Sequence, residues 1–321
     1  MKSIAVISFL FYLFTNTSAQ RGVYIDTIAS SLNFLNYISV TSKATVVKCN
    51  GKSNAKLISL TNPAHNQQLC EYTIRAYNTR VCQLRVDFHY FNVGQPSITP
   101  ERPYAHCSDD RLIINGIPFD FCGTINQNHV YVPFDVQKSS DEVKLTIKLG
   151  TNSLAQWYIT VNQIECSEKA TTVKPDERQA PPGCLQYFYE SFGLVQSFNY
   201  GGDYYGDTKY AICFNRGKKV DANLVLNDIS FQMDVGDNTA PGYDSKCLPL
   251  TNPGGLTEDY IMIPKAIVTG TQERATIFCS NTITGQEIIS TARGPLVIEV
   301  NTDTKTTPNM ETGFRFRYRI V

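Results

Sequence analysis

Two runs in which apolar and polar residues alternate, residues 70–76 and 82–88, constrain the fold more than any other feature of the sequence. Every second residue of each run is apolar, which is the period of a β-strand with one buried face and not that of a helix. Residues 78–80 (Asn-Thr-Arg) interrupt the two runs. We therefore expect two consecutive strands that both turn a dry face toward one core.

A cysteine begins each of these runs, and the strand geometry limits what each cysteine can bond to. Cys82 lies beside the turn, whereas Cys70 lies about seven residues from it, roughly 20 Å at about 3.3 Å per residue. A disulfide needs Cα atoms within about 7 Å of each other. Cys70 and Cys82 should therefore each bond to another part of the same domain.

The N-terminus indicates export from the cell. Residues 1–19 have the features of a secretory signal, with Lys2, an apolar run over 4–14, and small residues before Gln20. The apolar run is too short to span a bilayer, and no later segment approaches the required length of about 20 apolar residues. We expect a secreted, extracellular chain without membrane insertion.

Composition and motifs exclude several classes of function. Removing Lys2 from 29 basic and 29 acidic residues leaves a net charge of -1, which argues against a nucleic acid or an anionic membrane as partner. The four histidines show no HExxH spacing, and no GxSxG nucleophile segment occurs. All ten cysteines follow the signal without a CxxC pair, which favours five disulfides over a metal centre. We expect no enzyme activity.

The sequence divides into two similar halves. In residues 49–166, short alternating runs are separated by Gly, Asn and Asp, the pattern of an antiparallel sandwich. Residues 167–183 carry three prolines, several charges and no aromatic residue, and so predict a semi-stiff linker. The same kinds of motif recur in 184–321, where residues 278–280 (Phe-Cys-Ser) repeat residues 121–123 (Phe-Cys-Gly). Residues 20–48 stay unassigned beyond one or two edge strands.

The ordered set of motifs across both halves resembles a pair of CUB domains, and it is similar to the tandem CUB-domain proteins secreted by insects. The resemblance implies an all-β chain of two antiparallel jelly-roll β-sandwiches in tandem. The motifs are residues 59–63 leading to Cys70, 82–88, Cys107-x-x-Asp110 with 112–114, 121–123, 157–166, 183–188, 193–200, 259–264 and 313–314.

The same resemblance implies the disulfide pairing. In this family the first cysteine of a domain pairs with the second and the third pairs with the fourth, which leaves two cysteines that begin one strand and end the closing strand. The expected bridges are Cys49–Cys70, Cys107–Cys122, Cys184–Cys213, Cys247–Cys279 and Cys82–Cys166.

Calcium is the one cofactor that the resemblance suggests. Many CUB domains hold Ca²⁺ with an acid before the third cysteine, the aspartate that follows that cysteine, and an aspartate before the closing strand. Asp234, Asp259 and Asp303 fill these places in the second domain, although an additional stretch over 248–258 interrupts the pattern there. In the first domain only Asp110 matches, and we expect no calcium.

An aromatic cluster over 187–210 offers a second candidate site. Tyr204 and Tyr205 would lie at a loop tip and give rigid ligand contacts if they are exposed. The alternative is that the cluster is core, with Phe188, Phe192 and Phe198 buried.

These features together predict a secreted, non-catalytic binding or adhesion protein whose sandwiches present loops to an extracellular protein or glycan. Fold-level inference of this kind names no ligand. Two alternatives stay open: a self-associating structural or matrix component, and a regulatory partner of an extracellular protease cascade.

Overall fold

The computed structural model groups the chain into two units, Met1–Ala44 and Thr45–Val321, and the description below concerns the second. The expected signal and residues 20–43 lie outside the described residues. No helix among the described residues has the length and hydrophobicity needed to cross a membrane. The structure describes residues 44–63, 67–138, 140–151, 154–166, 176–217, 219, 221–233, 243–247 and 259–321.

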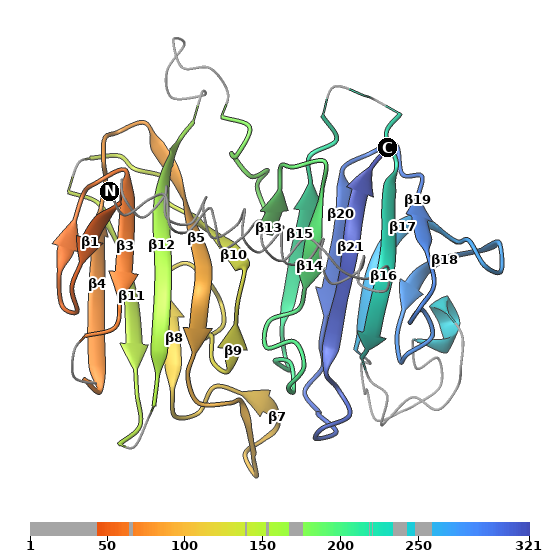
Figure 1. The fold of residues 1–321 in the computed structure, drawn as a ribbon, viewed down its shortest axis with the longest axis horizontal. Coiled ribbons are helices and arrows are strands. Elements are labelled where there is room, and N and C mark those ends of the chain that lie inside the picture. Colours follow the sequence, from red (N-terminus) through yellow and green to blue (C-terminus); the bar gives the residue numbers. More distant parts are fainter. Residues whose placement is uncertain are drawn as a thin grey trace, which may run out of the picture. The chain divides into compact units, whose positions relative to one another are not determined.

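The first half of this unit is a sandwich of two sheets (Figure 1). One sheet has the order β1-β3-β12-β5-β10, with β9 added beside β5, and the other has the order β2-β4-β11-β8. The strands are β1 (Thr45–Val47), β2 (Lys52–Ser53), β3 (Leu57–Thr61), β4 (Leu69–Arg75), β5 (Val81–Asn92), β8 (Arg111–Ile114), β9 (Thr124–Ile125), β10 (Asn128–Pro133), β11 (Glu142–Lys148) and β12 (Gln156–Glu165), and the separate hairpin of β6 (Ser97–Thr99) and β7 (Arg102–His106).

The alternation of apolar residues explains how this sandwich forms its core. Tyr72 and Ile74 of β4 are fully buried, and so are Val86 and Phe88 of β5, although the two strands belong to different sheets. The apolar faces of β4 and β5 therefore pack against each other in one hydrophobic core between the two sheets. The prediction that two consecutive strands share one core is confirmed.

The second half is one sheet of nine strands that turns around its own core. Its middle strand, β17, changes partners: residues 260–262 pair with β20, and residues 266–268 pair with β19. The strands are β13 (Cys184–Phe188), β14 (Phe192–Gln196), β15 (Lys209–Phe214), β16 (Leu224–Gln232), β17 (Tyr260–Val268), β18 (Glu273–Phe278), β19 (Ile288–Ser290), β20 (Leu296–Asn301) and β21 (Gly313–Ile320).

The expectation of purely antiparallel sheets is wrong at three places. The pairs β1–β3, β2–β4 and β13–β15 are parallel. In the sequence β2 lies between β1 and β3 but belongs to the opposite sheet, so the chain leaves its sheet and re-enters it in the same direction. Residues 189–208 likewise give the chain enough length to return before β15, which a tight hairpin could not do.

Disulfides tie both halves internally. Among the described residues no cysteine is free, and none of the bridges joins one half to the other. The bridges are Cys49–Cys70, Cys82–Cys166, Cys107–Cys122, Cys184–Cys213 and Cys247–Cys279. Four of them are the pairs that the family resemblance implies, and Cys82–Cys166 is the pair expected from the two cysteines that remain.

The two halves meet in a buried surface that we call the joint. Its aromatic centre is formed by Phe119 and Phe121 of the first half and Phe198, Tyr205 and Tyr210 of the second. Phe198 and Tyr205 belong to the same apolar cluster as the core of the first sandwich. The first core therefore continues into the second half of the chain.

Part of the expected linker belongs to this packed unit. Residues 167–175 lie outside the described residues, but Ala180 is only 2 % exposed. The side chain of Gln83 on β5 accepts a hydrogen bond from the Ala180 amide at 3.0 Å and donates one to its carbonyl at 2.7 Å. The prediction of a semi-stiff linker over 167–183 is therefore wrong for the residues near Ala180, because the Gln83 side chain binds their backbone and they pack against β5.

Candidate functional site

Tyr204 and Tyr205 are buried, which contradicts their expected place at an exposed loop tip. Their exposed fractions are 4 % and 5 %. The Tyr205 hydroxyl donates to the carbonyl of Cys122 at 2.7 Å and accepts from the Cys122 amide at 2.9 Å. Tyr205 therefore fastens the joint, and Tyr204 donates its hydroxyl proton to the carboxylate of Asp259.

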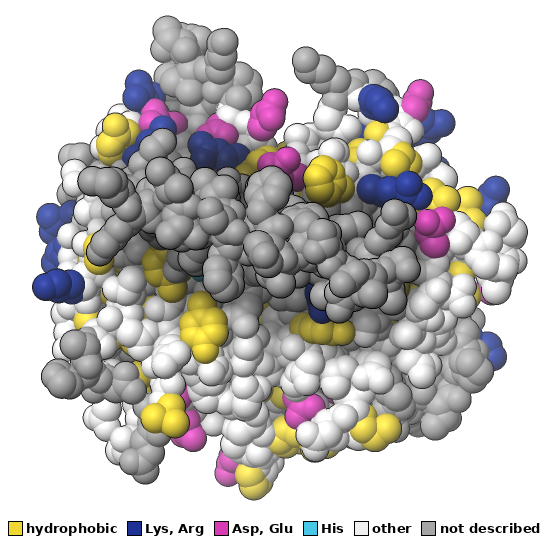
Figure 2. Space-filling model, viewed as in Figure 1, with side chains coloured by type: hydrophobic (Ala, Val, Ile, Leu, Met, Phe, Trp, Pro, Cys, Tyr) yellow, Lys and Arg dark blue, Asp and Glu magenta, His cyan; other side chains and the backbone are white. Residues whose placement is uncertain are grey.

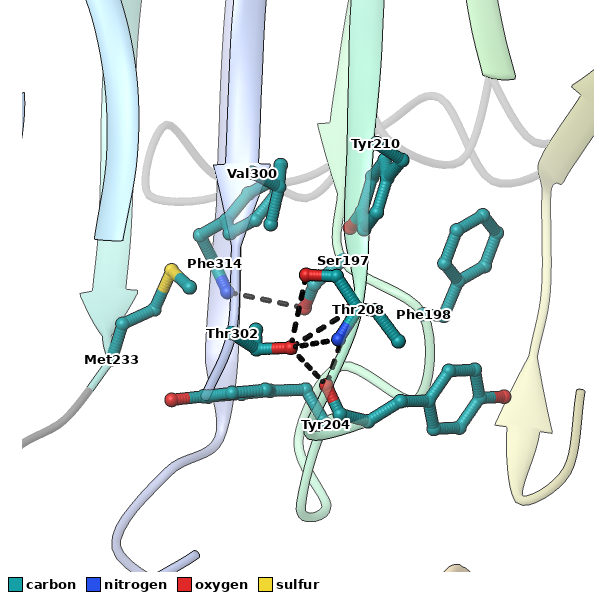
Figure 3. A pocket seen from close by; sticks show the side chains of 10 residues that line it. Ser197, Phe198, Tyr204, Thr208, Tyr210, Met233, Val300, Thr302 and Phe314 are labelled. Carbon is teal, nitrogen blue, oxygen red and sulfur yellow. Dashed lines mark hydrogen bonds between the residues drawn. The ribbon is translucent and has the colours of Figure 1, made fainter. Parts of the chain in front are cut away.

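The space around these tyrosines is too small for a ligand. Figure 3 shows Tyr204, Thr208, Thr302 and Phe314 among the side chains around a cavity of about 10 Å³. That volume is about what one water molecule requires. The Thr208 amide donates to the Thr302 hydroxyl at 2.9 Å, so the polar atoms of the wall bond to each other. The aromatic cluster is core here and not a ligand platform.

One member of the cluster departs from the core interpretation. Phe198 is buried and Phe188 packs against Phe214 with ring centroids 5.5 Å apart, as expected of core residues. Phe192, however, is 73 % exposed on β14. Phe192 lies opposite the exposed Arg319 of β21, so its side chain stands on the solvent-facing side of the sheet and not on the core side.

Two of the three expected calcium ligands lie together. Oδ1 of Asp259 accepts a hydrogen bond from the Asp303 amide, and Oδ2 accepts from Tyr204. Oδ1 of Asp303 accepts from the Lys305 amide at 2.8 Å. Asp259 directly precedes β17, and Asp303 follows β20, so the pairing of these strands brings the two aspartates together. Asp234 lies outside the described residues.

The electrostatics around Asp259 favour either a proton or a cation. Burial raises the pKa of the Asp259 carboxyl well above its ordinary value. The hydrogen bonds from Tyr204 and from the Asp303 amide lower this pKa in part, and the negative charges of Asp303 and Glu311 raise it. Among the described residues no group of three or more acidic, histidine or cysteine side chains is close enough together to hold a metal. The described pair, Asp259 and Asp303, thus supplies two of the hard oxygen donors that calcium prefers, and further ligands would have to come from elsewhere.

Comparison with known protein families gives one match, and it lies in the second half of the chain. Residues 181–321 match the animal CUB domain. We call these residues the CUB region; they contain the Tyr204–Asp259–Asp303 cluster.

Comparison with individual proteins adds less. The solved structures with similarity include the CUB1-EGF-CUB2 domains of rat MASP-1, at 13 % identity and a TM-score of 0.27, with 86 % of this chain and 100 % of that chain covered. The full extracellular region of zebrafish Gpr126/Adgrg6 has 12 % identity and a TM-score of 0.27, with 86 % and 36 % covered. No curated protein matches. The similarity of this chain to CUB domains therefore rests on the family match over residues 181–321.

The first half has a different arrangement at the position that corresponds to Asp259. Oδ2 of Asp110 accepts a hydrogen bond from the Gly94 amide at 2.8 Å, and Oδ1 accepts from the Gly150 amide at 2.7 Å. A Cβ added at Gly94 would lie 3.1 Å from the Asp110 side chain, so a larger residue at this position would push the Asp110 carboxylate away by a few tenths of an ångström. Two backbone amides thus bind the Asp110 carboxylate, whereas the Asp259 carboxylate accepts one backbone amide and the Tyr204 hydroxyl.

A buried histidine at the joint had no signal in the sequence. His129 of β10 is 5 % exposed, and its Nε2 accepts a hydrogen bond from the Tyr187 amide of β13 at 3.1 Å. Next to it, Gln186 donates to the side chain of Asn128. Sequence alternation places a histidine inside or outside a strand but cannot show that a strand from the other half covers it.

Proposed function

We propose that this chain is a secreted, non-catalytic binding protein with two CUB-like sandwiches in tandem that present loops to an extracellular protein or glycan. The match of the CUB region supports the extracellular assignment, and the five disulfides suit an oxidising compartment. Figure 2 shows acidic and basic side chains interspersed on the visible described surface. Such a surface suits selective local contacts more than bulk electrostatic attraction.

The joint is the observation that carries this proposal. The rings of Phe121 and Phe198 lie 5.2 Å apart across it, and Tyr205 makes two hydrogen bonds to the backbone of Cys122. A buried joint of this kind holds the loops of both sandwiches at fixed spacing. Loops fixed before binding lose less conformational entropy when a partner binds, which favours recognition.

The test is chemical crosslinking of the tagged, secreted chain in its native extracellular fluid, with the attachment sites mapped by mass spectrometry. We expect crosslinks from loops of the sandwiches to a defined extracellular partner, and a monodisperse monomer in sedimentation at tens of micromolar. Crosslinks only between copies of the chain, together with concentration-dependent assembly, would instead support a structural or matrix component. Turnover in a hydrolase screen would contradict the non-catalytic assignment.

We also propose calcium as a ligand of the CUB region, held by Asp259 and Asp303 with Asp234 as a third donor. The buried Asp259 carboxylate, its neighbour Asp303 and the acidic Glu311 create a field that a divalent cation would neutralise. Bound calcium would fix the loops that carry these aspartates, and we assign it no chemical step.

Millimolar Ca²⁺ should raise the melting temperature relative to chelator by several degrees, since ligand at about 100 times its Kd adds about 2.7 kcal/mol of stability. Asp259→Asn should abolish that difference. Asp110→Asn is the matched control, because the partners of Asp110 are backbone amides: it should lower the melting temperature equally with and without calcium. Equal midpoints for the wild type in both buffers would rule out the site.

A further inference from the structure

A basic hollow lies on the CUB region, away from the joint and the aspartate cluster. It has a volume of about 510 Å³, which is within the range of small-ligand sites. Three cationic side chains line it, together with two threonines; they are Lys265, Arg274, Arg293, Thr276 and Thr291. We use the term basic hollow for these five residues.

Three adjacent segments build this surface. The pairing of β17 with β18 is shifted between Met262 and Ala266, and Lys265 lies in this bulge with a φ of 48°. The Lys265 carbonyl accepts a hydrogen bond from the Thr291 amide at 3.1 Å, which ties the bulge to the segment after β19. Bulges of this kind redirect side chains out of the regular alternation of a strand.

Arg274 reaches the same hollow from β18. It lies directly opposite Ile267 of β17, and the neighbouring pair Ala266–Ala275 is buried. Side chains alternate along a strand, so Arg274 and Ile267 share one face of the sheet, and both residues line the hollow together with the neighbouring alanine pair. Lys265 and Arg274 are both exposed, and neither forms an ion pair among the described residues.

The charge of the hollow is positive. Its cations face a single lining acid, Asp244, and Oδ1 of Asp244 already accepts the backbone amides of Thr276 and Ile277 at 2.8 and 2.9 Å. Arg293 pairs with Asp221, but both side chains of this pair are more than two-thirds exposed, so a ligand could displace it at little cost. The hollow thus offers cations and hydroxyls to an anionic ligand.

The walls favour a glycan over a peptide as that ligand. A peptide would most readily add as a strand along the free edge of β18. No strand can add there, because the backbone amides of Thr276 and Ile277 on β18 already donate to the Asp244 carboxylate, and Tyr243 forms a β-bridge with Phe278. None of the lining residues is a large aromatic side chain of the kind that anchors protein partners.

We propose that the basic hollow binds a sulfated or carboxylated glycan segment, with Lys265 and Arg274 as the principal contacts to its anionic groups. This inference builds on the proposed binding function and names one ligand class and its site. Arginine pairs planar oxyanions through two parallel hydrogen bonds, and lysine adds a point charge on a flexible stem. The threonine hydroxyls then bond to the sugar.

The probe is a heparin tetrasaccharide, titrated calorimetrically into the secreted chain at 50 mM and 300 mM NaCl. We expect binding at 50 mM that weakens with salt, and at least a tenfold loss of affinity in the double variant Lys265→Gln/Arg274→Gln. The matched control is Lys52→Gln/Arg102→Gln, which removes the same charge from exposed positions of the first half of the chain, one on β2 and one on the β6–β7 hairpin. It should bind as the wild type does.

Three outcomes would overturn the inference. They are no binding by the wild type, an equal loss in the control variant, and tighter binding of a polyglutamate peptide of matched charge. Each of these leaves the crosslinking result untouched, so failure of the glycan site is distinguishable from failure of the proposed binding function. Unchanged melting temperatures of both double variants would show that the loss of affinity is not a loss of folding.

Discussion

Phe121→Ala is expected to lower the free energy of unfolding by about 3–5 kcal/mol, the usual cost of removing a fully buried phenylalanine. Phe121 has no exposed surface. Its ring lies 5.5 Å from that of Phe88 in the first core and 5.2 Å from that of Phe198 in the second half. The cavity would therefore weaken the first core and the joint together, and both halves should unfold in one transition at a lower urea concentration.

Two spectroscopic signals can test this coupling. Trp157 is the only tryptophan of the chain and is buried in the first sandwich, so its fluorescence reports that half, whereas far-UV circular dichroism reports both. Phe316→Ala, at a fully buried position in the second core, is the matched control. Coupled halves require that Phe316→Ala also shifts the Trp157 transition. A dichroism transition that stays at the wild-type midpoint in Phe121→Ala would show that the halves unfold independently.

The strands could be predicted because their information is local. The alternation that begins at Cys70 and Cys82 specifies which side chains face inward, and both strands form with those faces buried. The parallel pairs could not be predicted in this way. Whether β13 joins β15 in the same or the opposite direction depends on the path of residues 189–208, which periodicity does not describe.

The joint was not predictable for a related reason. The sequence around Phe198 and Tyr205 contains no local signal that these residues enter the core of the other half, although both belong to that cluster. Composition likewise predicts a semi-stiff linker over 167–183, whereas the side chain of Gln83 binds the backbone of Ala180. The periodicity of apolar residues in each half reflects the strands of that half, so it does not reveal the contacts between the two halves.

His129 makes the joint sensitive to acid. Burial lowers the pKa of the His129 imidazole well below its ordinary value, and the nearby charge of Arg85 lowers the pKa further, while the Tyr187 carbonyl opposes this effect. Arg85 is itself paired with Asp87 on β5 at 2.8 Å, and it donates to the Tyr131 hydroxyl at 3.2 Å. Nε2 of the neutral imidazole accepts the Tyr187 amide proton at 3.1 Å. A proton added to Nε2 would face that donor, although the Tyr187 carbonyl, 3.0 Å from Nε2, could accept it.

We expect the free energy of unfolding to fall by up to about 1.4 kcal/mol for each pH unit below 6.5. The reason is that His129 takes up a proton in the unfolded chain at these pH values but stays neutral in the folded chain. The contribution is complete above the ordinary pKa of 6.5 and is lost as the pH falls toward the lowered pKa of the folded state. Urea midpoints measured at pH 7.5, 6.5 and 5.5 give this pH dependence of stability.

His129→Gln can still accept the Tyr187 amide and should remove most of the slope of stability against pH. His89→Gln, at a half-buried histidine whose pKa is also lowered, should remove a smaller share. The lowered pKa values of Glu165 and Asp176 act only below their ordinary values of 4.5 and 3.8. The raised pKa of Asp259 makes stability fall as the pH rises, which opposes the His129 slope, but this effect is the same in the wild type and in both histidine variants. Equal slopes in His129→Gln and the wild type would therefore mean that acid acts on the chain somewhere other than the joint.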